Sequence, residues 1–79
     1  MRTSAAREEL PAARDVRFDG DMMHVHLMDG RIISVPLDWF PRLKKARPAD
    51  RENCRLIGGG VGIHWPALDE DISVKALLR

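Results

Sequence analysis

A histidine and three consecutive carboxylates stand close together near the end of this 79-residue chain. His64 is followed by Asp69, Glu70 and Asp71 in the stretch IHWPALDEDISV. A carboxylate that orients a histidine can support acid and base catalysis. The few Ser and Thr residues lie in no recognisable nucleophile motif, however, and Cys54 has no motif beside it. Negative charge before a helix is also favoured by the helix dipole, so we predict no catalytic residue and no enzyme activity.

Three histidines are the candidates for a metal site. His24 and His26 stand two apart in a predicted strand, so their side chains face one side of a sheet about 7 Å apart. Together with His64 and a carboxylate they would form a ligand set that zinc accepts. The same spacing is typical of any solvated strand with alternating polar residues. We therefore predict no metal and no other cofactor.

A basic segment, residues 42–55, is the candidate for nucleic-acid binding. Its six cations, against two carboxylates, are Arg42, Lys44, Lys45, Arg47, Arg51 and Arg55. Phosphate contacts by such cations would make binding strongly salt-dependent. The whole chain, however, has 13 Lys and Arg against 12 Asp and Glu, and this net charge of +1 excludes the strong field of a typical nucleic-acid-binding domain. Nucleic-acid binding is therefore our alternative hypothesis.

Alternating apolar residues predict the strands that position these side chains. Within residues 16–37, three sets of apolar residues at every second position are separated by Asp-Gly turns. A three-residue loop that ends at Gly30 would place Val25 opposite Ile33 and keep apolar residues on one face. The pattern therefore predicts a three-stranded antiparallel meander, with Gly30 in the left-handed region.

Short helices are predicted after the meander and at the end of the chain. Asp38 can cap a helix from Trp39 to about Ala46, because an aspartate accepts hydrogen bonds from the unpaired amides of a first turn. Ser73 can cap a last helix over residues 74–78 in the same way.

Two further short strands, residues 55–57 and 61–65, are predicted around the glycine triplet at 58–60. A strand follows the triplet, whereas a phosphate loop needs a following Lys and Ser or Thr at the start of a helix. The predicted fold is α+β: a small antiparallel sheet of about five strands, a meander and then a hairpin, with two or three short helices. Residues 15–79 would form a single domain and residues 1–14 a flexible N-terminal arm.

Two runs of the sequence resemble a bacterial family catalogued as domain of unknown function 2442. They are DGRIISVPLDWFPRLKKA, residues 29–46, and GGGVGIHWPALDEDISVKALL, residues 58–78. The resemblance implies a small α+β domain and no particular activity. Members often look like the second gene of a compact two-gene unit, beside another small protein that is suspected of being a toxin. The resemblance therefore points to an antitoxin or a partner subunit.

We predict a small non-enzymatic protein-interaction module of the bacterial cytoplasm. The lone cysteine, and the lack of an apolar run of the length that a signal peptide or a membrane span needs, favour that location. The expected partner is a small protein encoded by a neighbouring gene, the suspected toxin, and a homodimer is the other assembly considered. Because opposite charges orient partners and aromatic residues anchor interfaces, the predicted partner-binding residues are His64, Asp69, Glu70, Asp71 and Trp39.

Overall fold

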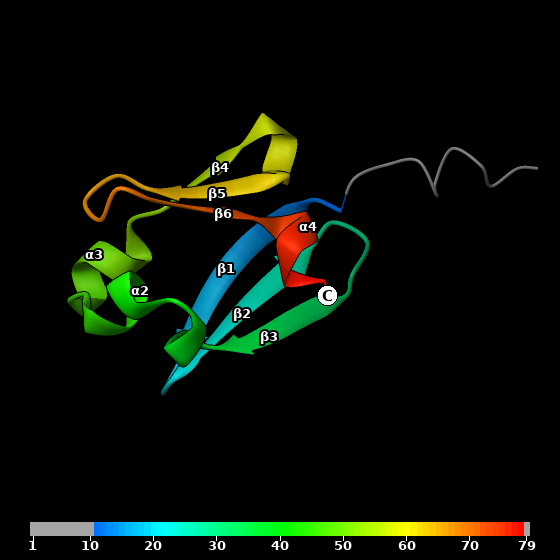
Figure 1. Ribbon diagram of the computed structural model, residues 1–79. Coiled ribbons are helices and arrows are strands. Elements are labelled where there is room, and N and C mark those ends of the chain that lie inside the picture. Colours follow the sequence, from blue (N-terminus) through cyan, green and yellow to red (C-terminus); the bar gives the residue numbers. More distant parts are fainter. Residues whose placement is uncertain (1–10, 79) are drawn as a thin grey trace, which may run out of the picture.

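Six strands in two antiparallel sheets form most of the fold in the computed structural model, which describes residues 11–78 (Figure 1). The first sheet contains β1 (Ala13–Asp19), β2 (Met22–Leu27) and β3 (Ile32–Pro36) in that order. The second sheet contains β4 (Arg55–Ile57), β5 (Gly62–Trp65) and β6 (Glu70–Ser73) in that order. The α+β class and the three-stranded meander are confirmed. The fold differs from the prediction in having one strand more and two separate sheets.

Short helical segments connect and close the sheets. They are the 3-10 turn η1 (Leu37–Trp39), α2 (Pro41–Lys45), α3 (Pro48–Glu52), the 3-10 turn η2 (Gly58–Gly60) and α4 (Val74–Leu77). None of the helices within residues 11–78 is long and apolar enough to span a membrane.

The single helix predicted from Trp39 to Ala46 is wrong. Phe40 adopts φ −132° and ψ 84°, which separates η1 from α2. The cause is Pro41, because a proline ring disfavours the helical conformation of the residue before it. Asp38 caps neither segment and pairs instead with Lys44. Both short segments therefore begin without a side-chain cap.

The β2–β3 hairpin has the predicted register. Val25 lies opposite Ile33, and Gly30 has a φ of +96° at the end of the loop. The Leu27 amide donates to the Arg31 carbonyl at 2.8 Å and closes the three-residue connection. Burial of the apolar face thus selects the register, since a slip of one residue would expose it.

β1 begins earlier than the predicted start of the domain. Ala13 lies opposite Leu27 and is buried, although we assigned it to the arm of residues 1–14. An irregularity in the pairing between Ala13 and Asp15 turns Ala13 inward, and alternation of residue types does not reveal such a bulge. Residues 1–10 of the predicted arm lie outside the described part of the chain.

One hydrophobic core joins the two sheets. Its buried members are Ala13, Val16, Met23, Val25, Leu27, Val35, Leu37, Leu43, Ile63, Trp65, Ile72, Val74 and Leu77. Trp65 is fully buried, and its indole N–H donates to the Arg51 carbonyl at 2.8 Å. The only polar atom of this large side chain is therefore satisfied inside the core.

The glycine triplet has a structural role in this core. Gly60 has a φ of +105°, and a Cβ atom there would lie 2.3 Å from the backbone oxygen of Ala13. Only glycine allows η2 to approach β1 so closely. The packing of two backbones therefore accounts for Gly60.

The acidic segment before the last helix forms β6, a strand that was not predicted from the sequence. The segment Glu70–Ser73 pairs with β5, and Asp71 lies directly opposite His64. Asp69 ends the connecting turn with a φ of +51°, a left-handed conformation that Asp tolerates better than most residues. The prediction that these carboxylates serve the dipole of the following helix is therefore wrong. Ser73 does occupy the N-cap position of α4, but its side chain makes no cap hydrogen bond.

Candidate functional site

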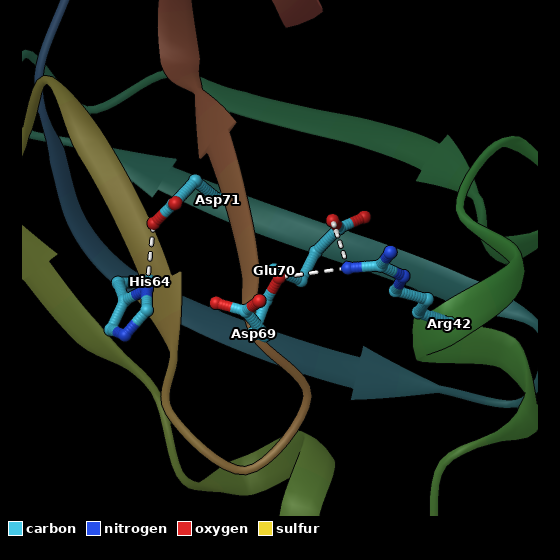
Figure 2. A network of polar contacts seen from close by, with 5 residues as sticks. All are labelled: Arg42, His64, Asp69, Glu70 and Asp71. Carbon is cyan, nitrogen blue, oxygen red and sulfur yellow. Dashed lines mark hydrogen bonds and ion pairs between the residues drawn. The ribbon is translucent and has the colours of Figure 1, made fainter.

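A polar network at the β5–β6 hairpin contains the histidine and the three carboxylates singled out by the sequence (Figure 2). The Nδ1 atom of His64 lies 2.6 Å from Oδ1 of Asp71, across the strand pair. Arg42, from α2, donates to the backbone oxygen of Asp69 at 2.8 Å and approaches Oε1 of Glu70 to 4.0 Å. The structure thus brings a cation of the basic segment into contact with the acidic segment.

This contact between the basic segment and the acidic segment was not predicted from the sequence. Arg42 connects α2 to the start of β6, and Glu70 is turned towards α2 (Figure 2). His64 and Asp71 lie on the other side of the hairpin and face away from Arg42 (Figure 2). The network therefore has a part that joins two elements of the fold and a part that faces solvent.

The His64–Asp71 contact is largely exposed. The side chain of His64 is 30% exposed and that of Asp71 is 71% exposed. Water screens the attraction between such groups, so the contact fixes the direction of the imidazole and adds little electrostatic energy. In Figure 2, Nε2 of the ring points away from Asp71.

The outer face of the second sheet carries two rows of side chains. The pairing of β4, β5 and β6 aligns Arg55, His64 and Asp71 in one row and Ile57, Gly62 and Ser73 in the next. Alternate residues of a strand point to opposite sides, so these two rows share one side of the sheet. The row between them, which includes the buried Ile63 and Ile72, faces the core.

A groove of about 310 Å³ is hollowed into this outer face at Gly62. Ile57 and Val61 line one side, and Asp71 and Ser73 line the other. The groove exists because Gly62 contributes no side chain between those of the neighbouring strands. It combines an apolar wall with a polar wall, a pattern typical of small recognition sites.

The three histidines do not share a site. His24 and His26 lie on β2 in the first sheet, where Nδ1 of His24 is 2.7 Å from Oγ of Ser34, and His64 lies in the second sheet. The ligand set that would need all three is therefore not formed, because the chain forms two sheets. Within residues 11–78, no group of three or more His, Cys, Asp or Glu side chains is arranged to hold a metal ion.

Arg51, one of the six cations of the basic segment, is built into the fold. Its guanidinium donates to the backbone oxygens of Leu43, Lys44 and Ala46 at 3.1–3.3 Å. It also lies 5.6 Å from the centre of the Phe18 ring, a cation–π distance. Because these carbonyls belong to the end of α2, Arg51 satisfies acceptors that a helix leaves unpaired.

Other cations of the basic segment also have partners within the chain. Lys44 pairs with Asp38, and Arg47 approaches Asp50 to 3.3 Å. The Asp38 carboxylate raises the pKa of the Lys44 ammonium. Lys45 and Arg55 make no ion pair with the residues that the structure describes. The segment is therefore less available to phosphates than its charge suggests.

Trp39 lies in η1 and is about half exposed. It belongs to neither row of the second sheet's outer face, so it is not part of the groove. The other tryptophan, Trp65, is the core residue. Trp39, which we predicted as a partner-binding residue, is thus the exposed tryptophan of the two.

A family model described as protein of unknown function (DUF2442) matches residues 13–79. The chain belongs to this family. The resemblance noted from the two sequence motifs is thereby confirmed. The start of the match also agrees with the start of β1 at Ala13.

Solved structures share the DUF2442 fold of this chain. A crystal structure of a protein of unknown function from Rhodospirillum rubrum has 28% identity and a TM-score of 0.75, and the match covers 89% of this chain and 87% of that one. An uncharacterised protein from Chromobacterium violaceum, solved by NMR, has 22% identity and a TM-score of 0.72, over 85% of this chain and 63% of that one. The second likeness shows the fold alone. No curated protein matches the chain.

Among the residues that line the groove, Asp71 alone was predicted as a binding residue. Gly62 was read as an ordinary position of a strand, and Ser73 as a helix cap. A glycine inside a strand is a signal that could have indicated the groove, because it often marks a place where another group approaches the backbone.

Proposed function

We propose that this DUF2442 domain is a non-enzymatic protein-interaction module that binds a small partner protein through the outer face of its second sheet. The groove at Gly62 is the observation that carries this proposal. An apolar side chain of the partner would fill it against Ile57, and His64 with Asp71 would supply polar contacts beside it. An apolar anchor with polar neighbours is typical of protein interfaces.

The partner that we propose is the small protein encoded by the neighbouring gene. This choice follows from the two-gene arrangement that the family resemblance implies, and the chain would then act as an antitoxin-like or accessory subunit. Arg55 and Asp71 stand at opposite ends of one row of the outer face, so the face can orient a partner of complementary charge. We place this interaction in the cytoplasm, because the single Cys54 offers no intramolecular disulfide.

Nucleic-acid binding has less support. Arg42, Lys44, Arg47 and Arg51 contact other groups of the chain, and a phosphate would have to compete with those contacts. Of the six cations, Lys45 and Arg55 then remain to contact phosphates and release their counterions, which is the process that drives such binding.

Co-expression with the neighbouring gene tests the proposed function. We expect the two proteins to co-purify from a tag on either chain, and the complex to elute early from a heparin column. Late elution with a steep salt dependence, abolished by Lys44→Ala and Lys45→Ala together, would support the nucleic-acid alternative. Failure of the neighbour to associate would contradict the proposed function.

A further inference from the structure

β4 is an edge strand with an accessible backbone. Among the described residues it pairs with β5 alone, and all three of its residues are exposed. Leu56 is 41% exposed and Ile57 is 47% exposed. An edge strand presents a row of unpaired N–H and C=O groups, which another extended chain can use. Native edges are usually protected by charge, proline or a covering segment, and β4 has a single charge, Arg55.

We infer that β4 pairs with an extended segment of the partner protein, which adds a fourth strand to the second sheet and places a carboxylate opposite Arg55. This inference rests on the proposed function, because it names how the partner of that face is held. Arg55 begins the row that continues through His64 to Asp71. Asp71, at the far end, is already in contact with His64, whereas Arg55 has no ion pair among the described residues. A strand that pairs with the free edge of β4 would place a carboxylate next to Arg55.

The register of the added strand follows from the alternation of β4. Every pair in this sheet is antiparallel, and we expect the new pair to be so as well. The partner residue opposite Arg55 is then acidic, and the two residues before it face Leu56 and Ile57 and are apolar. The segment that fits has the order apolar, apolar, acidic. Main-chain hydrogen bonds would supply affinity, and the side chains would select this order.

β4 of a second copy fits less well. Suppose that β4 strands of two copies pair antiparallel, with a two-fold axis at Leu56. Arg55 of each copy would then lie opposite Ile57 of the other copy and would meet no carboxylate. A shift that brings the two Arg55 side chains together would oppose like charges. Charge complementarity therefore favours a different protein over self-pairing.

Two short peptides test the side-chain order directly. The probes are acetyl-Lys-Thr-Val-Val-Glu-Thr-amide and the same peptide with Lys in place of Glu, each titrated into the protein and followed by NMR. We expect the Glu peptide to bind about five-fold or more tightly than the Lys peptide, and Arg55→Glu to reverse the preference. Arg14→Glu, the same charge change on β1, should leave the preference intact. Failure of both peptides to bind, equal affinities of the two, or no reversal by Arg55→Glu would overturn the inference.

Hydrogen exchange in the complex with the neighbour's protein tests the pairing itself. We expect the amides of β4 that face away from β5 to become protected on binding, and Arg55→Glu to weaken the complex while Arg14→Glu does not. Binding that fills the groove but leaves β4 unprotected would overturn strand addition and leave the proposed function standing. Absence of any complex would contradict the proposed function, and the peptides would then decide the inference separately.

Discussion

His64 and Asp71 face each other across the β5–β6 pair, with 2.6 Å between Nδ1 and Oδ1. A histidine held by a carboxylate is a familiar catalytic arrangement, but here the carboxylate is mostly in water. A strongly exposed pair contributes little to folding. The contact is therefore best understood as a way of presenting the imidazole on the outer face of the second sheet.

Asp71→Asn is expected to change the free energy of unfolding by less than about 1 kcal/mol, because exposed ion pairs rarely contribute more. Urea denaturation followed by circular dichroism measures this. The same variant should weaken binding of the partner, since a neutral amide holds the imidazole less firmly than the carboxylate does. A loss of stability well above that limit would show that the pair supports the fold and would contradict its assignment to a binding surface.

Gly60→Ala is expected to destabilise the protein severely, by about 2–4 kcal/mol, through the clash with the Ala13 backbone and the positive φ. Gly59→Ala is the matched control. Gly59 also has a positive φ, of +74°, but a Cβ atom there meets nothing within 4 Å. Gly59→Ala should lower the free energy of unfolding by only about 1–2 kcal/mol, the strain of the left-handed conformation alone. Equal losses for the two variants would refute the close approach of η2 to β1.

Arg51→Ala is expected to lower the free energy of unfolding by about 1.5–3 kcal/mol, because hydrogen bonds from a charged donor are worth that much. Arg51→Lys should recover little, since one ammonium cannot bridge three carbonyls as a guanidinium does. Lys45→Ala, in the same basic segment, should change stability by no more than about 0.5 kcal/mol. Chemical denaturation measures the free energy of unfolding of the three variants. An unchanged stability of Arg51→Ala would show that Arg51 does not support the fold, and Arg51 would then again be a candidate for nucleic-acid binding.

The thiol of Cys54 should react slowly in the folded protein. Burial raises the pKa of this thiol, and the nearby Glu52 carboxylate adds to the shift. The thiolate is the reactive form, so a raised pKa leaves less of it at neutral pH and moves the rise in reactivity to higher pH. Alkylation by iodoacetamide across a pH series, compared with the urea-unfolded chain, measures this. Equal rates in both states at neutral pH would contradict the partial burial.

Much of the first sheet could be predicted from the sequence because one face of each strand is buried. The alternation around Val25 and Ile33, together with the turn at Gly30, leaves one register that keeps the apolar side inside. The second sheet gave weaker signals. β6 has four residues and one buried apolar side chain, Ile72, so its period of two cannot be recognised.

The candidate site was predicted in part, for a related reason. Residue types identified His64 and Asp71, but not the pairing that sets them opposite each other, because that depends on β6. The contact of Arg42 with Asp69 joins residues 27 positions apart, and charge patterns do not specify such partners. The groove depends on the missing side chain of Gly62, which is visible only when the neighbours from β4 and β6 are in place.

The most direct measurement of the proposed function is the affinity of Gly62→Leu for the neighbour's protein, by isothermal titration calorimetry. A Cβ atom at Gly62 meets nothing closer than 3.9 Å and the φ is not positive, so the variant should fold, and its side chain should fill the groove. We predict that its affinity falls by about tenfold or more, whereas Ser34→Leu, on the outer face of the first sheet, binds like the original protein. An unchanged affinity of folded Gly62→Leu for the neighbour's protein would contradict the proposal that the partner binds at the groove.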